Sequence, residues 1–415
     1  MKRSTRRILT THTGSLPRPK ELLEMMTAKE AGEAVDRDIL NSSIRDAVHA
    51  IVRKQAEAGV DIINDGEMSK PGYSNYIKDR MTGFGGESIG LGSGGTQLGD
   101  LQDFPEYAAR LFPSVASVLK TPACTGPISY QDTDDLETDI ANLKEASSRV
   151  KAEEVFMSAA SPGVISLFLP DQHYGSHEAY LAALSDAMKT EYRAIHDAGF
   201  LLQVDCPDLA MGRHIQFNDL SVAQFRKKAA LHVEALNHAL AGIPAESVRI
   251  HLCWGNYEGP HHRDVPLKDI VDVVLKANVG AISFEGSNPR HEHEWRVWEG
   301  VKLGGKALIP GVLDSSCNFI EHPDLIAERI VRLARLVGRE NVMAGSDCGF
   351  STFAGFVVVE PGITWAKLAS MAEGARRASR ELWRKATRAA ASRKPGKGTK
   401  TKSSRARVRG RRHSR

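Results

Sequence analysis

Short apolar runs alternate with stretches of helical periodicity along nearly the whole chain, and this alternation constrains the fold more than any other feature. The expected strands end near residues 13, 67, 161, 206, 253, 285, 314 and 348. Helical spacing is clearest over 38–59, 176–199, 222–241, 323–336 and 363–388, and shorter helices are expected over 266–276 and 295–301. Continuously apolar strands separated by helices are typical of a parallel sheet that helices cover.

About eight strand–helix units favour a (β/α)8 TIM-type barrel over an open, doubly wound sheet. No Gly-x-Gly-x-x-Gly motif follows the first expected strand, so the sequence does not predict a dinucleotide site. In a barrel of this kind the functional residues gather at the C-terminal ends of the strands. Polar residues at those ends are therefore expected to meet at one mouth.

The domain organisation follows from the same alternation and from the charge distribution. We expect a single barrel domain over residues 1–390, in which 73–121 form an inserted excursion and the strand-like segment 122–130 forms part of a hairpin within it. Residues 391–415 contain about 11 basic side chains and no acid, so they account for more than the whole formal net charge of +4. We interpret this segment as a disordered basic tail with at most non-specific affinity for nucleic acid.

Composition excludes two classes of protein and suggests a compartment. No apolar run approaches the roughly 20 residues needed to cross a membrane. The basic start of the chain is followed by no long apolar stretch, which argues against a secretory signal. Five cysteines, an odd and sparse set, argue against a disulfide framework. We therefore expect a cytoplasmic protein.

Three strand ends carry side chains that suit a soft metal ion. His251 and Cys253 are two residues apart in an alternating strand, so they should lie on the same face. Glu285 and Cys348 close two later strands. An imidazole with thiolates is a donor set that suits zinc. The alternative, a buried histidine beside a buried cysteine in a barrel without metal, remains open at this point.

Seven short motifs at strand ends occur in an order that resembles the catalytic half of cobalamin-independent methionine synthase, over residues 9–382. They are Gly14-Ser15-Leu16-Pro17, Asp65-Gly66-Glu67, Gln203 with Asp205 and Pro207, His251 with Cys253, Phe284-Glu285, Pro310-Gly311-Val312 with Asp314, and Asp347-Cys348-Gly349.

This resemblance implies a zinc-dependent transfer of a methyl group from methylfolate to the thiol of homocysteine. It implies Zn²⁺ as cofactor, with His251, Cys253, Glu285 and Cys348 as ligands. It also implies that Ser15, Glu67 and Asp205 hold the amino acid head of homocysteine. Zinc would deprotonate the thiol, and Glu285 could be the ligand that the incoming sulfur displaces.

Some features differ from the family pattern and leave the alkyl donor open. The segment 165–169 has no tryptophan to stack on a pterin, and Ser315 and Ser316 stand where the family has a proton-donating histidine. His322, a few residues downstream, is the candidate catalytic acid. Chain length and the sequence Asp205-Cys206-Pro207-Asp208 are also similar to the epoxyalkane:coenzyme M transferase branch. In that alternative the zinc joins a small thiol to an epoxide or another electrophile.

Overall fold

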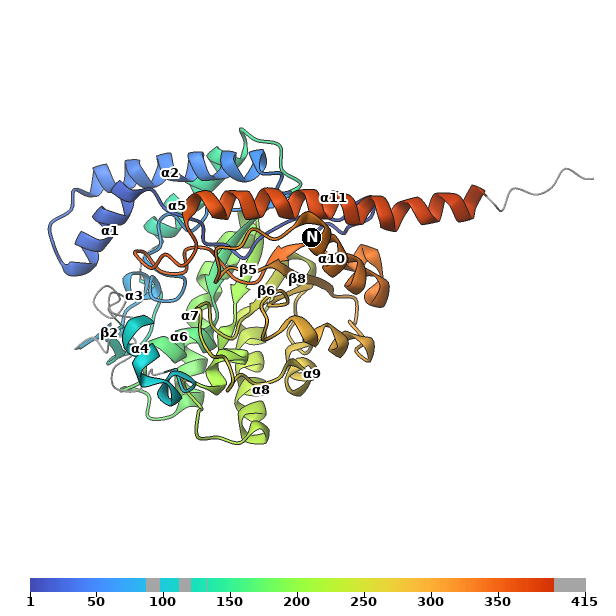
Figure 1. Cartoon of the computed structure of the whole chain (residues 1–415). Coiled ribbons are helices and arrows are strands. Elements are labelled where there is room, and N and C mark those ends of the chain that lie inside the picture. Colours follow the sequence, from blue (N-terminus) through green and yellow to red (C-terminus); the bar gives the residue numbers. More distant parts are fainter. Residues whose placement is uncertain (87–97, 112–120, 132, 392–415) are drawn as a thin grey trace, which may run out of the picture.

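A computed structural model describes residues 1–86, 98–111, 121–131 and 133–391 of the 415-residue chain (Figure 1). Seven parallel strands form one curved sheet, and neighbours in the sheet follow the order of the chain. They are β1 (Ile62–Ile63), β4 (Glu154–Ala160), β5 (Leu201–Asp205), β6 (Val248–Leu252), β7 (Ala281–Phe284), β8 (Ala307–Leu313) and β9 (Gly345–Ser346).

The backbone around Thr10 closes this sheet into a barrel. The Thr10 carbonyl accepts hydrogen bonds from the amides of Asp61 and Ile62 at 3.1 and 3.0 Å, on the β1 side. On the β9 side Thr11 donates to Ala344 at 2.8 Å, and Ala344 donates to Leu9 at 2.8 Å. The N-terminal segment thus serves as the eighth parallel strand, which confirms the predicted (β/α)8 barrel.

Helices cover the outside of the barrel. The helices that lie between or after the strands are α2 (Arg37–Glu57), α5 (Asp134–Ser147), α6 (Pro162–Phe168), α7 (His177–Asp197), α8 (Val222–Ala239), α9 (Val271–Val274), α10 (Pro323–Val337) and α11 (Pro361–Ala391). Side chains cap the starts of α7 and α8: the Ser176 hydroxyl accepts from the Ala179 amide at 3.2 Å, and Ser221 forms a capping box with Gln224. Helix α11 packs between α10 and α2, where Lys54 Nζ lies 5.6 Å from the centre of the Trp365 ring.

Several elements differ from those expected. The helix predicted over 266–276 is replaced by two short turns, η5 (Leu267–Asp269) and α9, because Glu294 Oε1 accepts from the Leu267 amide at 2.7 Å and holds the start of this segment against the next loop. The segment predicted as a helix over 295–301 is a 3₁₀ helix, η6 (Glu292–Glu299). Four other 3₁₀ turns lie in loops: η2 (Pro207–Leu209), η3 (Met211–Arg213), η4 (Ala245–Ser247) and η7 (Arg339–Asn341). Helices α1 (Lys20–Ala31), α5 and α6 were not predicted.

The inserted excursion contains the predicted hairpin. Strands β2 (Phe84–Gly85) and β3 (Ala123–Cys124) pair antiparallel, and α3 (Ile77–Arg80), η1 (Leu101–Asp103) and α4 (Pro105–Leu111) complete its described part. Asp100 ties it to the loop after β6, because one carboxylate oxygen accepts from the Tyr257 hydroxyl at 2.5 Å and from the His261 amide at 2.9 Å. The excursion therefore contacts a loop at the C-terminal end of the barrel.

The barrel interior is apolar at its floor and polar above it. Leu9, Ile62, Phe156, Leu201 and Met343 belong to the cluster that fills the floor. Above it the guanidinium of Arg249 lies 3.7 Å from the centre of the Phe156 ring and donates to Thr11 and His12, each at 2.9 Å. Because side chains alternate along β6, His251 follows Arg249 on the same inner face.

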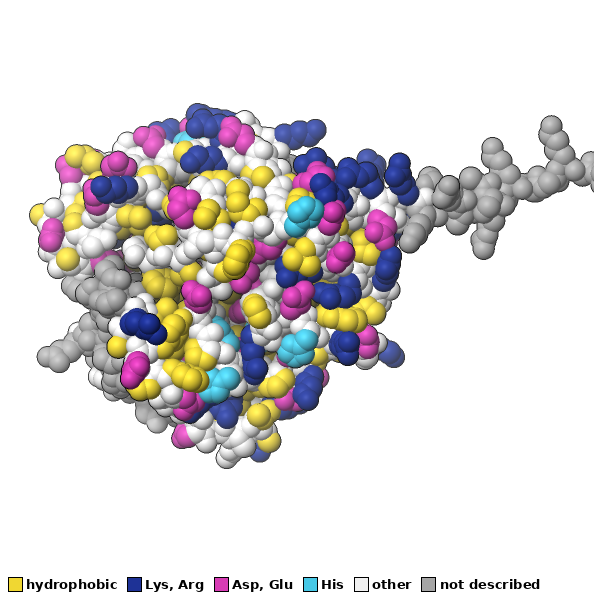
Figure 2. Space-filling view, viewed as in Figure 1, with side chains coloured by type: hydrophobic (Ala, Val, Ile, Leu, Met, Phe, Trp, Pro, Cys, Tyr) yellow, Lys and Arg dark blue, Asp and Glu magenta, His cyan; other side chains and the backbone are white. Residues whose placement is uncertain are grey.

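The C-terminal part of the described chain is basic. Lys and Arg side chains gather along α11 toward the end of its described residues (Figure 2), and Arg376 and Arg380 on this helix are more than half exposed. Helix α11 includes Ala391, and the rest of the predicted tail, 392–415, lies outside the described residues. Among those residues, no helix is long and apolar enough to cross a membrane.

Candidate metal and substrate site

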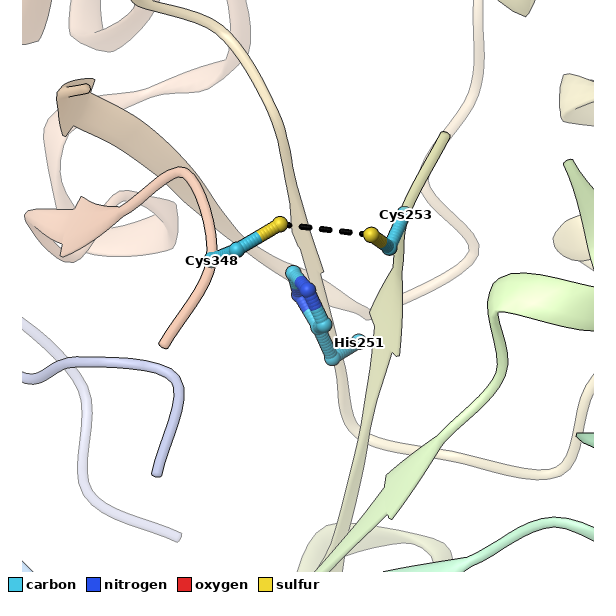
Figure 3. A group of neighbouring side chains, drawn as sticks. All are labelled: His251, Cys253 and Cys348. Atoms are coloured by element: carbon cyan, nitrogen blue, oxygen red, sulfur yellow. Dashed lines mark hydrogen bonds between the residues drawn. The ribbon is translucent and has the colours of Figure 1, made fainter. Parts of the chain in front are cut away.

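His251, Cys253 and Cys348 form a buried cluster at the mouth of the barrel. One ligand atom from each residue lies within 4.8 Å of those from the other two. The two sulfur atoms are 3.2 Å apart and point toward one another, with the imidazole of His251 beside them (Figure 3). Strand β6 presents His251, Cys253 follows directly after it, and the loop after β9 presents Cys348. The structure thus brings together three of the four predicted metal ligands.

The surroundings of His251 fit a metal ligand better than a structural histidine. Both imidazole nitrogens are buried, and neither has a hydrogen-bond partner among the described residues. An unpaired buried nitrogen is costly, so such groups are rare without a ligand. Burial and then the nearby cation of Arg249 lower the pKa of His251 to about 3. The imidazole is therefore neutral and has a free lone pair, as zinc requires.

The two thiols are held in their protonated form until a cation arrives. Burial, followed by the hydrogen bond with Cys253, raises the pKa of Cys348 well above its ordinary value. The hydrogen bond with Cys348 lowers the pKa of Cys253, but burial and the charge of Glu285 outweigh it and leave this pKa raised as well. A divalent cation between the sulfurs would reverse this balance by favouring the thiolates.

Glu285, the fourth predicted ligand, lies beside the cluster but outside it. Its Oε1 is 3.7 Å from the Cys348 sulfur and accepts a hydrogen bond from the Trp254 amide at 2.7 Å. Its Oε2 accepts from the side-chain amide of Asn288 at 2.7 Å. The carboxylate is therefore adjacent to the metal position and is held by other donors.

The predicted substrate residues lie next to this cluster. Asp205 is the direct neighbour of His251 in the pairing of β5 with β6, and its Oδ1 accepts from Gln203 at 2.8 Å. Glu67 Oε1 accepts from the Ser158 hydroxyl at 2.7 Å, whereas Glu67 Oε2 is buried and has no partner within the described chain. Burial and then the charge of Glu67 raise the pKa of Asp205 well above its ordinary value, which indicates that the two carboxyl groups face the same small region.

Ser15 reaches the same region from the N-terminal segment. Its hydroxyl accepts a hydrogen bond from the Ser351 amide at 3.4 Å. A Cβ atom at Gly349 would lie 2.0 Å from the Ser15 hydroxyl oxygen, so only glycine permits this approach directly after Cys348. Ser15, Asp205 and Glu67 therefore surround one side of the thiol cluster.

A cavity of about 410 Å³ opens onto the other side. Glu285 and Cys348 form part of its wall, together with Tyr257, His261, Arg290 and Ser315. This cavity could hold a second substrate against the sulfur atoms.

His322, the predicted acid, is not brought to this site. Its side chain is 71% exposed and caps helix α10, where Nδ1 accepts from the Asp324 amide at 3.2 Å, and it is not part of the cavity wall.

Two residues near the cluster had no clear signal in the sequence. Tyr73 lies in the excursion, and burial, followed by the proximity of the acidic groups of Cys253 and Asp205, raises its pKa well above the ordinary value. Asn288 contacts Glu285 from a loop whose sequence matches no motif. Neither residue type is distinctive in a loop, so only the three-dimensional arrangement reveals them.

Comparisons with known proteins agree with this architecture. Residues 169–375 match the family described as the catalytic domain of cobalamin-independent synthase. The chain is 25% identical to a methionine synthase of Saccharolobus solfataricus over 91% of this chain and 96% of that one, and 25% identical to a methionine synthase of Thermococcus kodakarensis over 89% and 93%. The fold is similar to the structure of a B12-independent methionine synthase from a Shewanella species, solved with selenomethionine (TM-score 0.70, 18% identity, 91% of this chain and 99% of that chain).

The fold and these relatives define the chain as a barrel enzyme of the methyltransferase class. Within that class it belongs to the cobalamin-independent methionine synthase family.

Proposed function

We propose that this enzyme transfers a methyl group to the sulfur of homocysteine, using zinc held by His251, Cys253 and Cys348, with Glu285 as an exchangeable fourth ligand. The observation that carries the proposal is the unpaired, buried imidazole of His251 beside two sulfurs 3.2 Å apart. A neutral imidazole with two cysteines is a donor set that binds zinc. When bound there, zinc converts a coordinated thiol into a nucleophilic thiolate near neutral pH.

The remaining residues orient the amino acid head of the substrate. Glu67 and Asp205 face one region, and Glu67 Oε2 has no hydrogen-bond partner among the described residues. This arrangement suits an ammonium group. The Ser15 hydroxyl, which lies against Gly349, would contact the same head group. The sulfur would then extend toward Cys253 and Cys348, and the methyl donor would occupy the cavity beside Glu285.

The paired carboxylates favour homocysteine over a thiol that bears a sulfonate, such as coenzyme M. A sulfonate in the same region would meet two acidic side chains, and like charges at short range are unfavourable. We infer methylfolate as donor from the family. His322 is unsuited to be its proton donor, because this side chain is exposed and caps a helix.

Two measurements on the purified enzyme and one in cells test this function. Metal analysis should find about one zinc per chain, and Cys348→Ser should lose most of it. Methionine formation should depend on both zinc and homocysteine, and expression of the gene should rescue a methionine auxotroph. Full zinc occupancy in Cys348→Ser would disprove the ligand assignment, and activity with coenzyme M but not homocysteine would replace the proposed substrate.

A further inference from the structure

The side chain of Asn288 connects the candidate ligand Glu285 to the loop in which Asn288 itself lies. Its Nδ2 donates to Glu285 Oε2 at 2.7 Å and to Asp347 Oδ2 at 3.1 Å. Its Oδ1 accepts from the amides of Arg290 and His291 at 3.1 and 3.0 Å. One end of the side chain therefore donates to two carboxylates, and the other end accepts from two backbone amides.

Only an amide side chain of this length satisfies both ends. Aspartate would keep the acceptor for the two backbone amides but would place a third carboxylate against Glu285 and Asp347. Asp347 in turn fixes the Asn288 backbone, because its two oxygens accept from the amides of Gly286, Ser287 and Asn288 at 2.8, 2.9 and 2.8 Å. The position of the Asn288 amide is thus set by the loop, independently of any contact with the metal cluster.

Both carboxylate oxygens of Glu285 accept hydrogen bonds, and neither donor belongs to the side chain of a proposed metal ligand. The Trp254 amide binds one oxygen and Asn288 binds the other, each at 2.7 Å. The carboxylate is nevertheless only 3.7 Å from the Cys348 sulfur, so a small rotation would bring it to the metal position. These two donors form a cradle beside the metal cluster in which a displaced carboxylate keeps its charge and its hydrogen bonds.

We propose that Asn288 is a positioning residue for ligand exchange: with the Trp254 amide, it stabilises Glu285 in the displaced position and thereby favours binding of the substrate thiol at the metal. This inference rests on the proposed function, because it requires a thiol that competes with Glu285. In such an exchange the thiol would release its proton to solvent, and Glu285 would leave the metal position for the cradle as a carboxylate. Without Asn288, Glu285 would stay on the metal and exclude the thiol.

The test uses the cobalt(II)-substituted protein, whose visible absorption responds to the number of sulfur ligands. L-Homocysteine is titrated into the wild type, Asn288→Asp, Asn288→Ala and the control Asn318→Ala. Asn318 lies on another loop, where its side chain bonds to the backbone of Val358 and Glu360. Asn288→Asp is the sharper variant, since it keeps the acceptor for Arg290 and His291. Retention of zinc against a chelator, without thiol, is measured in parallel.

We expect both Asn288 variants to bind homocysteine at least about tenfold more weakly than the wild type, because the loss of a hydrogen bond to a charged group has an effect of this size. Zinc retention without thiol should be unchanged or greater, because Glu285 stays on the metal. Asn318→Ala should match the wild type in both measurements.

Different results would refute the proposed function and the role of Asn288. Wild-type protein that binds cobalt but shows no spectral change with homocysteine would overturn the proposed function and this inference with it. A wild-type response that both Asn288 variants reproduce would refute the role of Asn288 and leave the function standing. Loss of zinc and of thiol binding together would show that Asn288 merely supports the loop, which also refutes the inference.

Discussion

Zinc binding to the metal-free protein should release about two protons per chain near pH 7.5. The pKa values of Cys253 and Cys348 are raised from their ordinary value of 9.0, so both thiols are protonated at this pH. Zinc binds the thiolates, so each cysteine must lose its proton. His251 contributes none, because its pKa of about 3 leaves it neutral already.

The sign and slope of the pH dependence follow from this count. Protons compete with zinc for the two sulfurs, so zinc affinity falls as pH decreases. With two protons released, the affinity should change about 100-fold per pH unit below the pKa values of the thiols, which is tenfold for each proton. At pH values above the thiol pKa values the dependence should disappear.

Isothermal titration calorimetry in two buffers of different ionisation enthalpy measures the number of protons directly. Cys253→Ser should reduce the release to about one proton. Cys124→Ser is the matched control, because Cys124 is buried in the hairpin of the excursion and its sulfur contacts the Gly126 carbonyl. A release of one proton or fewer by the wild type, or an unchanged release from Cys253→Ser, would refute the reasoning.

Three further predictions concern substrate binding and stability. Asp205→Asn should raise KM for homocysteine about tenfold or more by removing a charge-assisted contact, with zinc content unchanged; an unaltered KM would remove Asp205 from the substrate site. Gly311→Ala should lower the free energy of unfolding by about 1–3 kcal/mol or more, since its Cβ would lie 1.8 Å from Asp347 Oδ1, whereas Gly300→Ala, with no atom within 4 Å, should have little effect in the same denaturant titration. Arg80→Met should lower the free energy of unfolding by about 3–5 kcal/mol, because it leaves the buried carboxylates of Asp139 and Glu191, 2.5 and 3.3 Å from the guanidinium, without their cation. A decrease of less than about 1 kcal/mol would contradict this.

The cluster of candidate metal ligands was predictable because strand geometry places its residues. Period-two alternation along β6 puts His251 and Cys253 on the inner face, and the parallel arrangement brings the end of β9 to the same mouth. The same reasoning brings Glu67 and Asp205 beside them. Residues whose positions follow from strand ends could therefore be named from the sequence.

Residues whose positions depend on loops could not be predicted from the sequence. The hydrogen bonds of Asn288 depend on how the segment after β7 folds back on Asp347, and no periodicity describes that segment. Helix α5 was missed for a related reason: its buried face includes the polar side chains of Asp139 and Asn142, which interrupt the apolar pattern. His322 has the right residue type near the right motif, yet the start of α10 turns it toward solvent.

Arg249 is a buried cation beneath the acidic groups at the mouth of the barrel. Its guanidinium is fully buried one inner position below His251, and burial lowers its pKa to about 9, while the charge of Asp205 acts in the opposite direction. Burial, and after it the charge of Arg249, lowers the pKa of His251 and leaves the imidazole neutral, as zinc binding would require; the same cation acts against the rise in the pKa of Asp205. Two thiolates formed on zinc binding would cancel the charge of the ion, so the metal cluster itself adds no net charge to the interior. The ammonium group of the substrate would favour the charged form of Asp205, whose pKa is raised by burial and then by the charge of Glu67.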